Sequence, residues 1–158
     1  MQNLFAELKI KLKGKWSGEG FAKYPTIDST HYTEIWDFQP DEDKDAIYYN
    51  QKAWYKNKTD ENGKTVFWDT GFIILKENKI MLVSVQSGGR EETYELTDHS
   101  AKRLVFETID IRNDPRMIRT QRIIKLSENI LEYELNMSTH QNNNFQNHLA
   151  ARLVRNKI

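Results

Sequence analysis

The sequence predicts an all-β protein, an up-and-down antiparallel β-barrel of about ten strands with a short N-terminal helix. Segments rich in β-branched and aromatic residues recur through the 158-residue chain, and several of them alternate apolar with polar residues. Short turn signals such as Asn62-Gly63 separate these segments, which indicates antiparallel neighbours. Closing so many hairpin-linked strands removes their exposed edges. We therefore expect one domain, residues 1–158, with room inside for one small ligand.

The first element expected is an amphipathic helix over residues 3–13. Leu4, Phe5, Leu8 and Leu12 fall on one of its faces, so it can close one end of a barrel. A membrane-surface helix is the alternative, but a short helix with so few aromatic residues argues weakly for it. Strands are expected at residues 15–24, 32–39, 46–56, 66–76, 79–86, 89–96, 103–111, 116–126, 130–138 and 148–156.

The first strand carries an unusual glycine pattern. Gly14, Trp16, Gly18 and Gly20 are two residues apart, so they share one face. Because glycine weakens a strand, the pattern needs a reason: a sharp bend at a barrel corner, or a flat group against bare backbone. Trp16 is then either a structural tryptophan of the first strand or part of a cavity wall.

Composition excludes several function classes. The chain has 23 basic and 23 acidic residues and no net charge, so nothing attracts nucleic acid or an acidic membrane globally. It has no cysteine, which excludes disulfides, thiolate nucleophiles and zinc–thiolate sites. No apolar run is long enough to span a bilayer and the start lacks a signal-peptide pattern, so we expect a cytoplasmic protein.

Two loops interrupt the tight turns. Residues 41–45 are acidic, but a calcium loop needs glycine at its sixth and glutamate at its twelfth position, and these hold Ala46 and Lys52. We interpret them as a solvated turn. Residues 139–147 form the longest polar run, and we expect a mobile loop over one mouth of the barrel.

Histidine offers the clearest chemistry. Neither a Gly-x-Ser-x-Gly elbow nor a paired-histidine metal motif occurs. Two interpretations of the candidate histidine are open: a single-imidazole site such as haem iron uses, or a partly exposed loop histidine that binds nothing. His148 stands at the expected start of the last strand, and His140 is a competing ligand. Strict alternation places His148 with Ala150 and Arg152 rather than with Leu149, and the sequence does not decide which face points inward. The four histidines are His31, His99, His140 and His148.

Motifs along most of the chain resemble the nitrobindin family of haem-binding β-barrels, which are related in fold to fatty-acid-binding proteins. The resemblance is carried by the G-x-W-x-G-x-G motif at residues 14–20 with Tyr24-Pro25-Thr26-Ile27, by residues 69–73 and 85–89, by Met137-Ser138-Thr139, and by the His148-Leu149 start of the last strand.

The resemblance implies one haem b, with His148 as the axial ligand of a ferric iron that binds nitric oxide and converts peroxynitrite to nitrate. The family's haem-contact position matches Thr26, and the implied haem site also takes in Trp16, Gly18, Gly20 and Met137. Val66 and Phe67 stand where some relatives carry histidine or methionine, so we expect an apolar sixth coordination side. A homodimer is a further partner expectation.

Two other functions stay open at this stage. A haem-free carrier of a fatty acid or another small apolar molecule would place an arginine inside the barrel to pair a carboxylate, and Arg122 is the candidate. An interaction module would instead use an aromatic patch on the outer face, for which Trp36, Trp54 and Trp68 are the candidates.

Overall fold

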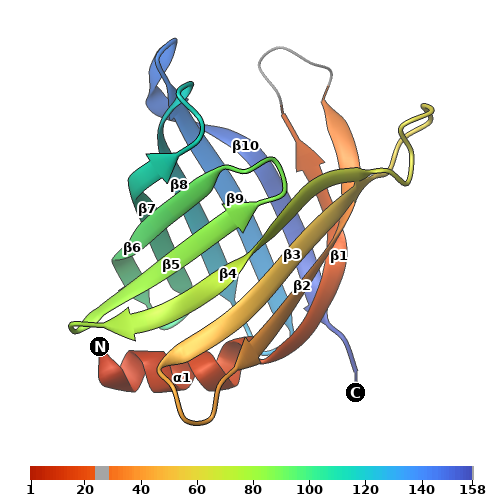
Figure 1. Cartoon of the computed structure of the whole chain (residues 1–158). Coiled ribbons are helices and arrows are strands. Elements are labelled where there is room, and N and C mark those ends of the chain that lie inside the picture. The colour runs from red at the N-terminus through yellow and green to blue at the C-terminus, as the bar shows by residue number, and fades with distance from the viewer. Residues whose placement is uncertain (24–28, 158) are drawn as a thin grey trace.

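A computed structural model describes residues 1–23 and 29–157, and in these residues one helix precedes ten strands (Figure 1). The elements are α1 (Gln2–Leu12), β1 (Gly14–Ala22), β2 (Thr30–Pro40), β3 (Ala46–Tyr55), β4 (Thr65–Lys76), β5 (Lys79–Gln86), β6 (Glu91–Ser100), β7 (Arg103–Arg112), β8 (Met117–Leu126), β9 (Ile130–Thr139) and β10 (Asn142–Arg155). Within the described residues, no helix is both long enough and apolar enough to cross a membrane.

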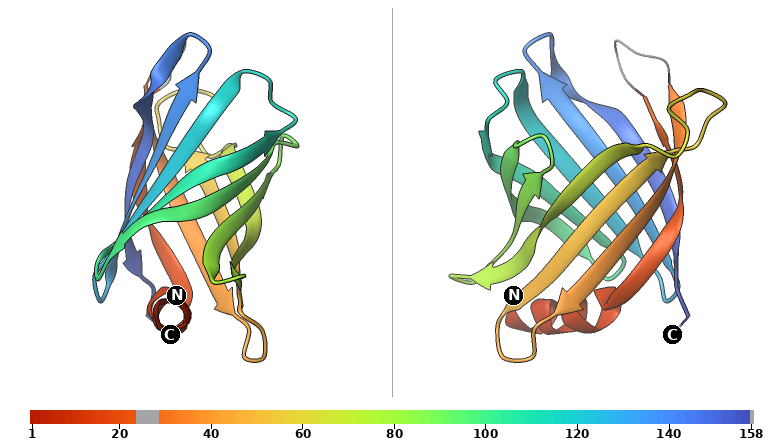
Figure 2. Two further views of the ribbon diagram at one scale, coloured as in Figure 1. Left: turned by 90° about the vertical axis from the view of Figure 1, so that its left-hand side faces the viewer. Right: turned by 45° about the vertical axis from the view of Figure 1, so that its right-hand side comes forward.

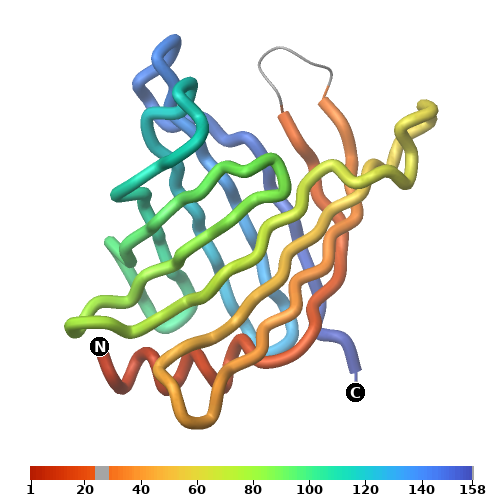
Figure 3. The backbone as a smooth tube through the Cα atoms, in the orientation of Figure 1, coloured from red at the N-terminus to blue at the C-terminus, as the bar shows by residue number. Residues whose placement is uncertain are grey.

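The strands form a closed antiparallel barrel. Each strand pairs with the next one along the chain, and β1 closes the ring by pairing with β10, as the continuous trace in Figure 3 shows. In that closing ladder Trp16 lies opposite Arg155 and Ala22 lies opposite Leu149. The predicted fold class is confirmed. Alternation within the strands turns one face of each inward, and these faces build the core.

Helix α1 closes one end of the barrel (Figure 2). Phe5, Leu8 and Leu12 are buried against the strands, which is the face that the apolar spacing predicted. Trp16 is also fully buried, and its Nε1 donates a hydrogen bond of 2.9 Å to the carbonyl oxygen of Leu12. Trp16 therefore fixes the end of the helix to the start of β1.

The last hairpin differs from the sequence prediction. The polar run 139–147 was expected as a loop, but β10 begins at Asn142, and only residues 140 and 141 turn between β9 and β10. The prediction of a long loop is wrong because the polar side chains bond across the hairpin: the Asn147 amide donates 3.1 Å to the side-chain oxygen of Asn136. Antiparallel pairing thus extends past the closed part of the barrel.

Gly18 is required by the way β1 meets β10. A Cβ atom on Gly18 would overlap the carbonyl oxygen of Arg152 and stand 2.7 Å from the Cα atom of Leu153. Glycine here permits a close approach of two backbones, which is one of the two reasons that its spacing suggested. Gly20 admits a side chain instead, because a Cβ atom there would overlap the ring of Tyr32.

We predict that Gly18→Ala lowers the free energy of unfolding by about 1–3 kcal/mol, because backbone atoms of β10 cannot yield as a flexible side chain would. Urea denaturation measures this loss. The matched control is Gly88→Ala, since a Cβ atom at Gly88 meets nothing within 4 Å. Equal stability of the two variants would contradict the close approach.

Candidate functional site

The end of the barrel opposite α1 is its mouth. The β3–β4, β5–β6, β7–β8 and β9–β10 connections lie there (Figure 1). The ladder between β7 and β8 stops at Glu107 and Gln121, and further toward the mouth the Thr108 hydroxyl bonds the backbone of Thr120 instead. The two strands therefore diverge near the mouth, whereas the helix-capped end is filled by apolar side chains.

A polar network crosses the middle of the barrel. Its centre is Arg122, which is fully buried and whose Nη1 lies 2.6 Å from Oδ2 of Asp69. The same guanidinium donates to the hydroxyl oxygens of Tyr94 at 2.9 Å and Ser84 at 3.1 Å. Tyr49 donates to Asp69 at 2.9 Å, so five strands contribute to one hydrogen-bonded group.

This arrangement bears on the lipid-carrier hypothesis. Arg122 points inward as predicted, but Asp69 already pairs with its charge, and Ser84 and Tyr94 accept two further hydrogen bonds from it. A buried guanidinium with such partners has no charge left for a fatty-acid carboxylate. The arginine is therefore a structural element of the barrel, and no observation favours the carrier.

A second buried carboxyl group lies nearer the mouth. Glu34 on β2 is 1% exposed, and its Oε1 accepts hydrogen bonds from Nε1 of Trp36 at 3.2 Å and from the amide of Gln51. Burial raises the pKa of Glu34 to about 7, although both bonds and the charge of Arg122 act in the opposite direction. The carboxyl group is thus about half neutral at pH 7.

Trp36 is therefore a core residue. It is fully buried, and its ring stacks on Phe38 at a centroid distance of 5.2 Å. Its predicted part in an outer aromatic patch is wrong, because alternation along β2 turns it inward with Glu34. Trp68 is exposed, and Lys52 lies 4.1 Å from its ring centroid on the outer face.

A small cavity opens beside Glu34. Its walls come from β2, β3, β4 and β10, and its lining residues are Tyr32, Glu34, Ala53, Val66, Phe67 and Leu149. Val66 and Phe67 were expected to make an apolar wall, and they lie in this cavity. Gly20 leaves room for the ring of Tyr32, so the glycine pattern of β1 shapes the cavity indirectly.

A β-bulge resolves the orientation of His148. In the β9–β10 ladder Asn147 pairs with Asn136 and Leu149 pairs with Leu135, so His148 is the extra residue. A bulge breaks the strict alternation and re-aims a side chain. His148 is half-buried whereas Ala150 is exposed, although both would share one face of a regular strand.

Electrostatics keep this imidazole neutral. Burial lowers the pKa of His148, and the positive charge of Arg90 lowers it further. Arg90 immediately precedes β6, which lies across the ring from β10, and it pairs with Glu92 at 3.3 Å and with Asp114 at 3.0 Å. A neutral imidazole is the form that binds a metal.

The other predicted site residues are placed as follows. Met137 is buried and faces inward on β9 near the mouth, where it pairs with Gln146. Trp16 lies at the helix-capped end, and Thr26 lies outside the described residues. His140 is exposed in the β9–β10 turn. Among the predicted haem contacts, His148 and Met137 therefore lie near the mouth, and Trp16 does not.

The donor set fits haem better than a bare metal ion. Residues 1–23 and 29–157 contain no group of three or more histidine, cysteine or acidic side chains able to hold a metal. A macrocycle that supplies its own equatorial nitrogens needs only one protein ligand.

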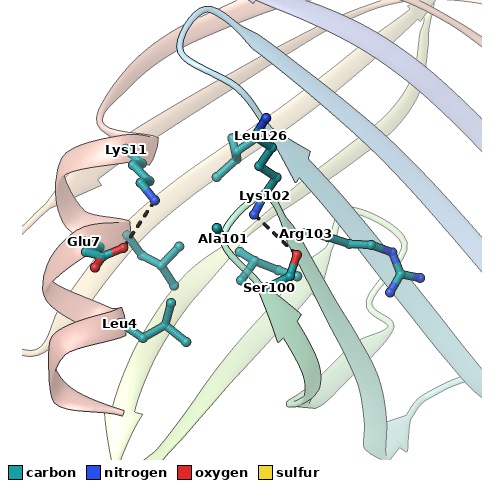
Figure 4. A pocket seen from close by; sticks show the side chains of 10 residues that line it. Leu4, Glu7, Lys11, Ser100, Ala101, Lys102, Arg103 and Leu126 are labelled. Atoms are coloured by element: carbon teal, nitrogen blue, oxygen red, sulfur yellow. Dashed lines mark hydrogen bonds and ion pairs between the residues drawn. The ribbon is translucent and has the colours of Figure 1, made fainter.

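A second crevice, between α1 and the β6–β7 turn, lies at the opposite end of the barrel and is lined by groups such as Glu7 and Lys11 (Figure 4).

From the sequence, Glu34 is one of several carboxylates for which a surface position is the favoured interpretation, and this interpretation is wrong because Glu34 is buried. Sequence reasoning missed Arg90. A signal for Glu34 was present, because Tyr32, Trp36 and Phe38 alternate with it on the apolar face of β2. Arg90 gives no comparable signal. It lies in a turn, and its partner Asp114 lies in another turn that comes close only after the barrel forms.

Comparisons with known proteins found a matching family model and related proteins. The model of the family described as "THAP4-like, heme-binding beta-barrel domain" matches residues 8–155. A protein of Arabidopsis thaliana named "Peroxynitrite isomerase Rv2717c" is 31% identical over 145 residues, 89% of this chain and 82% of that protein. A "Peroxynitrite isomerase" of Nocardioides sp. (strain ATCC BAA-499 / JS614) is 26% identical over 147 residues, 91% of this chain and 88% of that protein.

Solved structures extend the comparison to three dimensions. The crystal structure of Rv2717c from M. tuberculosis matches with a TM-score of 0.81 and 25% identity, over 97% of this chain and 98% of that one. The S-type phycobiliprotein lyase CPES of Guillardia theta matches with a TM-score of 0.62 and 9% identity, over 97% and 93% of the two chains. The second likeness concerns the fold alone.

We predict that Asp69→Asn lowers the free energy of unfolding by about 3–5 kcal/mol, because it leaves the buried charge of Arg122 uncompensated. Thermal and urea denaturation measure this loss. Asp110→Asn is the matched control: its pair with Arg112, at 2.9 Å, is exposed on both sides, so about 1 kcal/mol or less is expected. A loss at Asp69 no larger than at Asp110 would contradict the structural role of the buried pair.

Proposed function

The chain belongs to the family of THAP4-like, heme-binding β-barrel domains, and from this premise we propose that it binds one haem b at the mouth with His148 as the axial ligand. The observation that carries the proposal is the bulge at His148, which places one half-buried imidazole of lowered pKa at the mouth. Haem iron commonly takes a single proximal histidine.

We propose further that the loaded protein binds nitric oxide and isomerises peroxynitrite to nitrate. The names of the relatives from Arabidopsis thaliana and Nocardioides support this reaction. When bound, haem would supply a ferric Lewis acid. The chain itself would supply the neutral His148 as the ligand, and apolar walls such as Val66 and Phe67 would keep water from the cavity that they line.

Side chains at the rim can serve the propionates. Arg119 lies 4.5 Å from the ring centroid of Phe145, where β8 and β10 reach the mouth, and it is exposed. A cation held there can pair a carboxylate that faces water. The proposal needs no buried partner for the propionates, and it assigns no separate acid or base to the isomerisation.

We predict that haemin added to the purified protein gives a Soret band and that His148→Ala weakens haem affinity by more than about 100-fold. Loss of an axial ligand should exceed the 10–100-fold cost typical of outer-sphere partners. Absorbance titration measures both. His140→Ala is the matched control, because this residue is exposed in the turn of the same hairpin, and its affinity should equal that of the wild type. An unchanged spectrum and affinity in His148→Ala would overturn the ligand assignment.

We predict that the haem-loaded protein accelerates peroxynitrite decay and that nitrate is the product. Stopped-flow absorbance gives the rate, and ion chromatography gives the yield of nitrate. The apo-protein and an equal concentration of free haemin are the controls. Decay at the same rate with apo-protein and loaded protein would leave a haem-binding protein without this activity.

A further inference from the structure

The buried charges of the barrel are balanced with one exception. Asp69 is paired with Arg122, and Glu92 is paired with Arg90. Glu34 is as deeply buried as these carboxylates, but no cation lies within ion-pair distance of it in the part of the chain described. Its donors are the neutral indole of Trp36 and the neutral amide of Gln51. Ionised Glu34 would therefore leave the interior with one uncompensated negative charge.

The second oxygen of Glu34 is the next observation. Within residues 1–23 and 29–157, Oε2 of Glu34 is buried and has no hydrogen-bond partner. Glu34 also lines the cavity that it shares with Val66, Phe67 and Leu149, and Leu149 adjoins His148 in the chain. A buried polar atom without a partner beside a cavity indicates a missing water or ligand. Apart from Tyr32, the residues that line the cavity with Glu34 are apolar, so an occupant of the cavity can take this hydrogen bond.

We propose that Glu34 makes this cavity a proton-linked anion site: the neutral carboxyl group donates a hydrogen bond from Oε2 to an anion, and the carboxylate repels it. The inference rests on the proposed function, since it takes the anion to be a ligand of haem at the mouth. Beyond the proposed function, the inference assigns to Glu34 the selection of anionic, hydrogen-bond-accepting ligands at acidic to neutral pH.

The surroundings of Glu34 define which other groups respond to pH. Arg122 faces it from β8, and its charge favours the carboxylate. Tyr133 faces it from β9, and burial raises the pKa of that phenol well above its ordinary value, so it stays neutral. Tyr32 lines the same cavity on β2, and His148 on β10 has a lowered pKa. Burial raises the pKa of Glu34 to about 7. Among these groups, Glu34 is therefore the one whose charge changes near pH 7.

The size of the effect follows from Coulomb's law. Two unit charges about 8 Å apart at an effective dielectric constant of about 20 interact by about 2 kcal/mol, which is roughly 30-fold in affinity. Loss of a donated hydrogen bond adds to this in the same direction. A change of charge at Glu34 should therefore be measurable even without direct contact between the carboxyl group and the anion.

The experiment measures azide affinity of the ferric, haem-loaded protein between pH 5.5 and 8.5. Wild type should lose roughly 10-fold or more in affinity relative to Glu34→Gln as the pH rises from about 6 to 8. Nitric oxide, a neutral ligand, should show no such difference. Glu132→Gln is the matched control, because this carboxyl group is exposed on β9, and it should follow the wild type. Equal azide profiles for wild type and Glu34→Gln would overturn the inference.

Unfolding of the apo-protein gives a second test that needs no haem. The pKa of Glu34 is about 7 in the folded chain against 4.5 as its ordinary value, so the folded state retains the proton longer. Wild-type stability relative to Glu34→Gln is then full below pH 4.5 and is lost as the pH rises to about 7, roughly 300-fold in the unfolding constant. A constant difference across this range would overturn the inference.

The two proposals fail in different ways. No Soret band in the wild type would overturn the proposed function and the anion site together. A Soret band that depends on His148, together with azide affinities that change with pH in the same way in wild type and Glu34→Gln, would overturn the anion site alone.

Discussion

The ion pair between Arg122 and Asp69 is the constraint on which the interior of this barrel depends. The pair connects β8 with β4 across the barrel, over a separation of 53 residues, at 2.6 Å and with both side chains fully buried. Desolvating two such charges is costly, and hydrogen bonds from Tyr49 and to Tyr94 offset part of the cost. The network lies between the helix-capped, apolar half of the barrel and the mouth, and the cavity beside Glu34 lies on its mouth side.

The fold followed from the sequence because its signals are local. Alternation, turn residues and the apolar face of residues 3–13 each depend on neighbours within a few positions, and all ten strands and the helix lie where these signals put them, within a few residues at most ends. The polar run 142–147 is the exception. This run forms a strand because it pairs with Thr139, Met137 and Asn136 across the hairpin. Its amino-acid composition does not indicate that pairing.

The candidate site was only partly predictable for the same reason. His148 could be singled out from its residue type and position, but its orientation could not, because a bulge is a property of the paired strands and not of either one alone. The inward position of Glu34 is predictable, because strict alternation along β2 puts it on the same face as Trp36 and Phe38. Its protonation depends on burial by several strands, and only the assembled barrel supplies that.

Two buried carboxyl groups of the barrel thus have different partners. Asp69 forms an ion pair with Arg122, whereas Glu34 has neutral donors only, and burial raises the pKa of Glu34 to about 7. Near the mouth, burial and the positive charge of Arg90 both disfavour the imidazolium form of His148, which lowers its pKa. While Glu34 is protonated, the side chains that line the cavity carry no charge, so the field that attracts an anion there would come from the metal centre of a bound haem. Ionising Glu34 would cancel part of that field, and this is why its charge can control ligand affinity without a place in the coordination sphere.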